Sequence, residues 1–119
     1  MNNHEWLEKQ MRRDYMSIKE VTDATFTELT GQGTVIAELG AAWCGPCKMI
    51  APALEEIDQD SENKISVVQL DVDENPKTAQ HFGVMSIPTL LFFKDGELQE
   101  TTVGFKPKEE ILSIAEKLV

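Results

Sequence analysis

The sequence predicts an α/β protein with a mixed central β-sheet that is flanked by about four helices. Two mostly apolar runs of strand length, residues 34–39 and 65–72, are each followed by a helical pattern, which is typical of parallel strand–helix–strand units. Two further strand-like runs surround the pair Asp95-Gly96, which favours a tight antiparallel hairpin. With 119 residues, of which 41% are apolar, the chain is long enough to bury a hydrophobic core.

The first half of the predicted domain contains two strands and two helices. Residues 17–21 predict a short edge strand. Thr22 and Asp23 are expected to cap the helix that follows, and Gly31 to end it. Residues 34–39 predict a buried central strand that contains one acidic residue.

A second helix is expected to begin at Cys44 and to run to about residue 62. Its apolar positions have the period of a helix with one buried side; these are Met49, Ile50, Ala53, Leu54 and Ile57.

The second half of the domain continues the alternation and then departs from it. Residues 65–72 predict a second buried strand, and Pro76 suits the first turn of a short helix. Residues 89–93 and 98–103 predict the two strands of the hairpin, and residues 108–118 a last helix with one apolar side. The element order is therefore β-α-β-α-β-α-β-β-α.

Residues 1–16 differ from the rest, so we predict an N-terminal extension and a domain over residues 17–119. Leu7, Met11 and Tyr15 have helical spacing, but an isolated helix of this length is only marginally stable in water. The extension is therefore expected either to pack on the domain or to fray.

Composition and charge exclude several classes of partner. The formal net charge of −10 argues against nucleic acids and anionic membranes, because both require a basic surface. No apolar run approaches the roughly 18 residues that span a bilayer. The first residues lack the basic and apolar regions of a signal peptide, so a cytoplasmic location is expected. Stable structural disulfides are rare there, which favours a catalytic, redox-sensing or metal-binding role for the two cysteines.

Cys44 and Cys47 are the two cysteines of the chain, and their spacing suits redox chemistry. At i and i+3 of a helix start, their Cβ atoms are expected to lie roughly 5–6 Å apart, close enough for a disulfide. A thiolate at a helix N-terminus is stabilised by unpaired N–H groups and the helix dipole. We therefore expect Cys44, at the outer edge, to attack a substrate disulfide, and Cys47, one turn deeper, to resolve the mixed disulfide.

Residues 43–48 read Trp-Cys-Gly-Pro-Cys-Lys, which resembles the active-site signature of the thioredoxin family. Further segments resemble the family at the expected spacings: residues 49–52, 70–73, 87–90, 93–96 and 103–104. The resemblance covers about residues 17–119 and implies a thioredoxin fold. It also implies a monomeric protein-disulfide reductase that serves cell redox homeostasis without a bound cofactor. Its electrons would come from a flavoprotein thioredoxin reductase that uses NADPH.

The resemblance also implies roles for particular residues. Pro88, after Ile87, matches the cis-proline of the family, which lies against the active-site disulfide and presents the preceding backbone to substrate. A flat apolar rim would receive protein substrates; its members are Trp43, Gly45, Pro46, Met85, Ile87, Pro88, Gly104 and Phe105.

Three positions depart from the family pattern. Glu38 stands where the family usually has a buried aspartate that exchanges a proton with the deeper cysteine, and burial is expected to raise the pKa of Glu38. Gln69 replaces a lysine that often pairs with this acid, and Gly40 replaces a tryptophan. Loss of the indole is expected to leave room for the longer side chain of Glu38.

The cysteine pair has four alternative interpretations. A zinc site would need four ligands, and His4 and His81 do not form a second paired motif; haem attachment would need histidine at Lys48. A non-enzymatic binding module remains open, but it has no need of a reactive dithiol. An oxidase or isomerase also remains open, although Gly45-Pro46 resembles the reducing members of the family.

Overall fold

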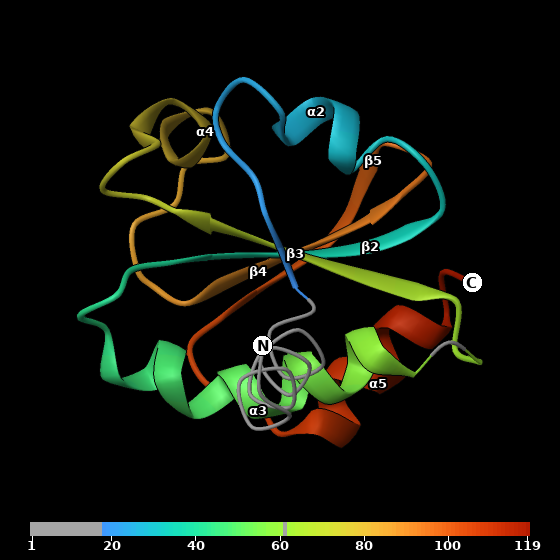
Figure 1. Cartoon of the computed structure of the whole chain (residues 1–119). Helices are drawn as coiled ribbons and strands as arrows, with labels where there is room; N and C mark the ends of the chain where they lie inside the picture. The colour runs from blue at the N-terminus through green and yellow to red at the C-terminus, as the bar shows by residue number, and fades with distance from the viewer. Residues whose placement is uncertain (1–17, 61) are drawn as a thin grey trace, which may run out of the picture.

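The computed structural model describes residues 18–60 and 62–119, and in this part of the chain four helices and five strands alternate (Figure 1). The predicted helix in the extension 1–16 lies outside the described residues, so that extension and the boundary at residue 17 stay predictions. The element order matches the predicted one. The elements are β1 (Lys19–Glu20), α2 (Phe26–Leu29), β2 (Thr34–Gly40), α3 (Gly45–Gln59), β3 (Ile65–Asp71), α4 (Pro76–His81), β4 (Thr89–Lys94), β5 (Glu97–Val103) and α5 (Lys108–Glu116).

The five strands form one mixed sheet in the order β1-β3-β2-β4-β5. β3 pairs in parallel with both β1 and β2, because the connections between these strands cross over through helices. β4 pairs antiparallel with β2 and β5. The hairpin turn between β4 and β5 has positive φ at Asp95 (49°) and Gly96 (86°), as expected for the Asp-Gly pair. The predicted mixed sheet is thus confirmed.

Helices cover both faces of the sheet, α2 and α4 one face and α3 and α5 the other (Figure 1). The core on the α3 side includes Ile36, Ile50, Phe92 and Ile111. The core on the other side is formed by different residues of the same strands, since side chains alternate between the faces; it includes Val35, Ala37, Leu39 and Leu91. Ile36 belongs to the α3 side, so Glu38 and Gly40 of β2 face α3 as well.

Two details differ from the sequence prediction. Asp23 does not cap α2, which begins after Thr25; it accepts hydrogen bonds from the backbone N–H of Thr78 (2.8 Å) and of Lys77 (3.3 Å) at the start of α4. Met49 is 65% exposed, although its spacing predicts an apolar core position of α3. The buried residues of this helix are Cys47, Ile50, Leu54 and Ile57, whose spacing of three and four defines the inner side.

In the part of the chain that the structure describes, no helix has the length and apolar character needed to cross a membrane.

Candidate active site

The two cysteines form a disulfide at the N-terminus of α3, with their Cα atoms 5.3 Å apart. Cys44 is the N-cap residue of this helix, and its Sγ accepts a hydrogen bond from the backbone N–H of Cys47 at 3.2 Å. Pro46 lies in the first turn, where the missing N–H of proline costs no helical hydrogen bond. The helix N-terminus therefore supplies one N–H donor and its positive dipole end to the sulfur that leaves as a thiolate when the disulfide is reduced.

Exposure does not distinguish the two cysteines in the disulfide form. Cys44 is 3% exposed and Cys47 is 6% exposed, so the prediction that Cys44 is the more accessible residue is not met in this state. Their surroundings differ instead. Cys44 lies between exposed residues, Trp43 and Gly45, whereas Cys47 is a buried residue on the inner side of α3. The asymmetry expected of an attacking and a resolving cysteine therefore lies in what surrounds each sulfur.

Glu38 is the charged residue buried under this site. It lies in the middle of β2, pairs with Gln69 of β3 and Leu90 of β4, and is 1% exposed. Burial raises the pKa of Glu38 to about 7, and a hydrogen bond from Gln69 Nε2 to Glu38 Oε1 (3.3 Å) acts in the opposite direction. The pKa of Glu38 is thus raised, as expected, and its hydrogen-bond donor is the neutral amide of Gln69.

Gly40 separates Glu38 from the cysteines. A Cβ atom placed on Gly40 would lie 2.9 Å from Glu38 Oε1 and 3.0 Å from Cys47 Sγ. Both atoms therefore approach the same bare Cα, and they lie no more than about 6 Å apart, within reach of direct contact or of one bridging water. The structure supports the expectation that a larger residue at position 40 would take space that the carboxyl group of Glu38 now uses.

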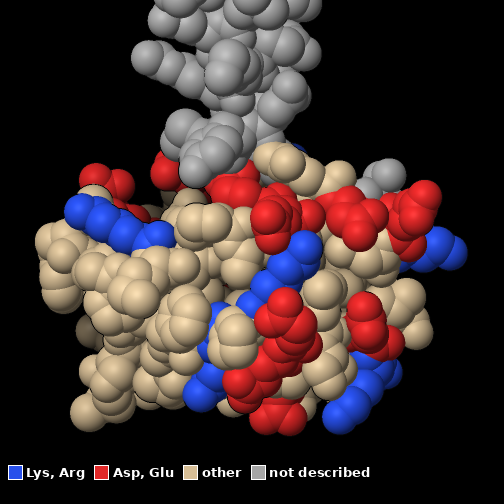
Figure 2. Space-filling view, turned by 90° about the horizontal axis from the view of Figure 1, so that it is seen from below, with Lys and Arg blue, Asp and Glu red and all other residues tan. Residues whose placement is uncertain are grey.

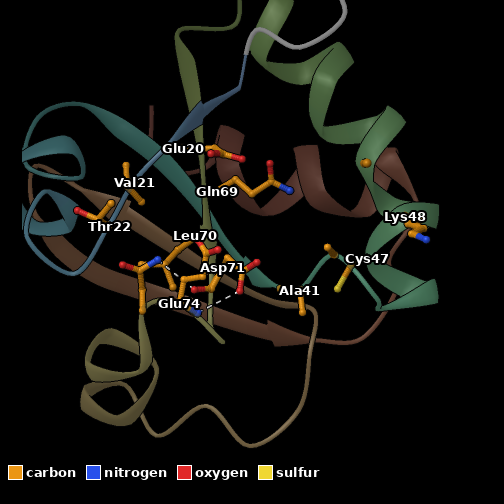
Figure 3. Close-up of a pocket in the computed structure, with 14 residues that line it drawn as sticks. Glu20, Val21, Thr22, Ala41, Cys47, Lys48, Gln69, Leu70, Asp71 and Glu74 are labelled. Atoms are coloured by element: carbon orange, nitrogen blue, oxygen red, sulfur yellow. Dashed lines mark hydrogen bonds between the residues drawn. The ribbon is translucent and has the colours of Figure 1, made fainter.

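A cavity of about 490 Å³ adjoins this cluster on the β3 side (Figure 3). Its lining comes from β1, β2, β3, α3 and the segment before α4, and it includes Glu20, Gly40, Cys47, Lys48, Gln69 and Asp71. In Figure 3, Gln69 and Asp71 of β3 lie across this space from Cys47 on α3. The cavity thus connects Cys47 with the charged residues at the edge of the sheet.

The predicted rim is exposed around Cys44. Trp43 is 69% exposed, and its indole Nε1 donates a hydrogen bond to Asp73 Oδ2 at 2.7 Å. Gly45 and Pro46 are exposed as well. The sequence analysis assigns no role to Asp73. The feature that could have identified it is its position just beyond the end of β3, near the start of α3. Its carboxylate fixes the orientation of an aromatic ring that would otherwise rotate in solvent.

A second part of the rim comes from the loop before β4 and from the end of β5. The bond between Ile87 and Pro88 is cis, as the resemblance implied. Because Leu39 pairs with Thr89, Pro88 lies at the end of β2, from which the chain leads to Cys44. The backbone N–H of Gly104 donates to the carbonyl oxygen of Pro88 at 2.8 Å and so joins the two segments. Ile87 and Gly104 are half-buried and Pro88 is buried, whereas neighbouring Met85 is 94% exposed.

Within residues 18–60 and 62–119, no three histidine, cysteine or acidic residues are grouped so as to hold a metal ion. His4, one of the candidate zinc ligands, lies outside the described residues.

Comparison with known proteins agrees with this geometry. The family model described as Thioredoxin matches residues 17–117. The chain belongs to the thioredoxin family. It is 56% identical to thioredoxin of Bacillus subtilis (strain 168) over 102 residues, which are 86% of this chain and 98% of the relative. It is 53% identical to thioredoxin of Listeria monocytogenes, with 86% and 99% of the two chains covered.

A solved structure, that of a mutant thioredoxin from Halobacterium salinarum, superposes with a TM-score of 0.79 at 32% identity and covers 84% of this chain and 88% of its own. The fold and the disulfide are therefore those of the thioredoxin family, and the protein is a thiol–disulfide oxidoreductase that acts on protein disulfides.

Proposed function

We propose that this chain works as a reductase, with Cys44 as the attacking cysteine, Cys47 as the resolving cysteine and Glu38 as the proton acceptor for Cys47. The observation that supports these roles is the placement of Cys44 at the N-cap of α3, with Cys47 behind it beside a buried acid. A thiolate at a helix N-terminus is the better nucleophile and leaving group, whereas a thiol beside a base becomes reactive when its proton is taken.

The reaction balances over two exchanges. The Cys44 thiolate attacks one substrate sulfur, a mixed disulfide forms, and the other substrate sulfur leaves as a thiolate that takes a proton from water. Cys47 then gives its proton to Glu38 and attacks Cys44 Sγ. The mixed disulfide breaks, the second substrate sulfur leaves as a thiolate that also takes a proton from water, and the Cys44–Cys47 disulfide forms, so two electrons have passed to the substrate.

Protein substrates are proposed to bind on the exposed apolar rim. Trp43, Gly45 and Pro46 flank Cys44 and are exposed, while Ile87 and Gly104 are half-buried and Pro88 is buried on the β4 side. Exposed aromatic and apolar side chains next to a reactive group favour contact with a partner protein over contact with water. The hydrogen bond from Trp43 to Asp73 supports this role, because an oriented indole loses less entropy when a substrate packs against it.

The cysteine pair itself is proposed to carry the electrons, without a bound cofactor or metal. An external dithiol must reduce the disulfide after each turnover, and we propose an NADPH-dependent flavoprotein thioredoxin reductase as its source. A site that must return to the dithiol fits the cytoplasm, where the glutathione pool keeps thiols reduced. We also propose that the protein acts as a monomer, since a rim covered by a second copy would not accept substrates.

Reduction of insulin disulfides by matched cysteine variants tests the assignment. Cys44→Ser is expected to abolish turnover and to form no mixed disulfide, because the attacking sulfur is gone. Cys47→Ser is also expected to lose turnover, but to accumulate a mixed disulfide on Cys44 that gels and mass spectrometry detect. Mixed disulfides trapped on Cys47 in place of Cys44 would contradict the roles.

The direction of transfer is tested by equilibrating the protein with glutathione. A reductase is expected to have a potential below that of the glutathione pool, whereas an oxidase or isomerase would lie well above it. Consumption of NADPH in the presence of purified thioredoxin reductase would identify the electron donor, and its absence would argue for another one.

A further inference from the structure

We propose that Gly40 is a positioning residue for the resolving step: its bare Cα allows the carboxyl group of a glutamate to lie against Cys47. The inference rests on the proposed role of Glu38 as proton acceptor and concerns what holds that acid in place. Gly40 itself touches neither substrate nor the reacting sulfur of Cys44 in this role, and it acts through the position of Glu38.

The main argument is steric. A Cβ atom on Gly40 would lie 2.9 Å from Glu38 Oε1 and 3.0 Å from Cys47 Sγ, whereas Cβ atoms in proteins essentially never come closer than 3.0 Å to another heavy atom. Of these two neighbours, Cys47 has a short side chain on the inner side of α3, and the helix backbone holds it whether or not the disulfide is formed. Any side chain at position 40 would therefore displace the flexible arm of Glu38 and move its carboxyl group away from the sulfur.

The length of Glu38 explains why the space is needed. Glu38 and Gly40 are two residues apart on one face of β2, so their Cα atoms are separated by roughly 6–7 Å along the strand. The carboxyl group of an aspartate at position 38 would stay closer to its own Cα. A glutamate has one more methylene, and its carboxyl group lies over Gly40. Glu38 Oε1 is within contact distance of the position that a Cβ atom on residue 40 would occupy. The acid at 38 and the glycine at 40 are thus geometrically coupled.

Neighbours of Glu38 come from β3, β4 and α3. On β3, the neutral amide of Gln69 donates to Glu38, and on β4 the partner is Leu90. On α3, Cys47 faces it. The charged residues that line the adjoining cavity are Glu20, Lys48, Asp71 and Glu74 (Figure 3). None of these residues changes in the variants below, so a shifted pH dependence reports on positions 38 and 40.

The cavity of about 490 Å³ beside Gly40 gives solvent access to the surroundings of Glu38. It adjoins Gly40, Cys47 and Gln69 on the β3 side of the disulfide, while Ile87, Pro88 and Gly104 lie on the β4 side. A substrate protein bound over the β4 side leaves the cavity in place. Glu38 itself does not line the cavity, so solvent in the cavity reaches Cys47 and Gln69 while the substrate is bound, and reaches Glu38 only by way of these neighbours.

A double-mutant cycle tests the coupling. The reduced protein is mixed with a chromogenic aromatic disulfide, and the two thiol releases, by Cys44 attack and by Cys47 resolution, are followed separately from pH 5.5 to 9. Gly40→Ala is expected to leave the first release unchanged and to slow the second about tenfold, with a shifted pH midpoint, because the base is displaced. Glu38→Asp is expected to slow the second release as well, because its carboxyl group falls short of Cys47.

The double variant tests whether the effects of positions 38 and 40 depend on each other. Gly40→Ala with Glu38→Asp is expected to resolve about as fast as Glu38→Asp alone, so that the two losses do not multiply, since the shorter acid leaves room for the methyl group. A double variant that is slower than Glu38→Asp by the full factor that Gly40→Ala costs in the wild type, or a Gly40→Ala protein with the wild-type rate and pH profile, would overturn the proposal. Should Gly40→Ala alone not fold, the comparison of Glu38→Asp with the double variant remains, and a slower or unfolded double variant overturns it.

Glu38→Gln separates this proposal from the one on which it rests. If Glu38→Gln resolves like the wild type at every pH, Glu38 is not the proton acceptor and the proposed function is wrong at that residue. If Glu38→Gln is slow while Gly40→Ala is normal, the role of Glu38 stands and only the role of Gly40 fails.

Discussion

Glu38 has an unfavourable position for a carboxylate. It is 1% exposed, and the hydrogen bond that it receives from Gln69 is 3.3 Å long. Burial of a charge without a cationic partner costs free energy, and the group responds by holding its proton, which is why its pKa rises to about 7. A group with this pKa changes its protonation state near neutral pH, as a proton acceptor for a thiol must.

The raised pKa predicts that the stability of the oxidised protein falls as pH increases. In the unfolded chain Glu38 ionises around its ordinary pKa of 4.5, whereas in the folded protein it ionises around 7. Between these values unfolding releases a proton, so rising pH favours the unfolded state, and the loss is complete above pH 7. The difference between the two pKa values corresponds to about 3 kcal/mol in the free energy of unfolding.

Urea unfolding of the disulfide form at several pH values between 4 and 8 measures this effect. Glu38→Gln is expected to lack this part of the pH dependence and to be more stable than the wild type at pH 8. Glu28→Gln, a matched change at an exposed acid of α2, is expected to keep the wild-type slope. Parallel curves for the wild type and Glu38→Gln would show that Glu38 does not titrate in this range.

At the level of elements, the start of α4 is held by a residue from far away in the chain. Asp23, in the loop after β1, accepts hydrogen bonds from the backbone N–H and the hydroxyl of Thr78, and its own N–H donates to Asn75 Oδ1. The hydrogen bonds from Thr78 are the main cause that lowers the pKa of Asp23. Asp23 therefore supplies to α4 the side-chain cap that the N-cap residue Asn75 does not make.

We predict that Asp23→Ala lowers the free energy of unfolding at pH 7, because α4 then loses its side-chain cap. Denaturant unfolding measures the change. Glu116→Ala, which removes an exposed acid at the end of α5, is the control and is expected to have little effect. Equal losses in the two variants would mean that the contact between the loop and α4 contributes no stability.

At the level of the whole molecule, charge and apolar surface are separated. The formal net charge is −10. In the view from the α3 and α5 side, charged side chains gather over the middle and right of the face; at the left end, where α3 begins, a basic side chain and some acidic ones lie along the upper edge and the rest is mostly uncharged (Figure 2). The exposed apolar residues Trp43 and Met49 belong to that end. Substrates therefore meet an apolar contact surface on a negatively charged protein.

This arrangement predicts a salt effect whose sign depends on the substrate. With acidic disulfide peptides the rate of reduction is expected to rise as salt is added, because screening weakens repulsion over distances above about 8–10 Å. With basic peptides of the same length it is expected to fall. Second-order rate constants at low and at high salt measure this, with a neutral peptide as control. The same salt dependence for all three peptides would contradict a role for the net charge.

Most of the fold was predictable because its signals are local. Apolar runs of strand length became β2 and β3, and the Asp95-Gly96 pair became the hairpin turn. The cysteine spacing predicted the bridge between Cys44 and Cys47. Each of these features depends on residues within about one element of each other, so backbone geometry and side-chain period suffice to infer them.

What the local pattern could not decide depends on contacts between distant segments. Asp23 was a plausible cap for α2, and only its approach to α4, far along the chain, shows which helix it serves. Met49 and Ile50 are equally apolar in sequence, but the packing of α3 on the sheet buries one and exposes the other. The resemblance to the family identifies Glu38 and Gly40 as departures from its pattern close to the cysteine motif. The meeting of Glu38 and Cys47 at the bare Cα of Gly40 follows from the docking of α3 against β2, because only that contact sets the space between a strand and a helix.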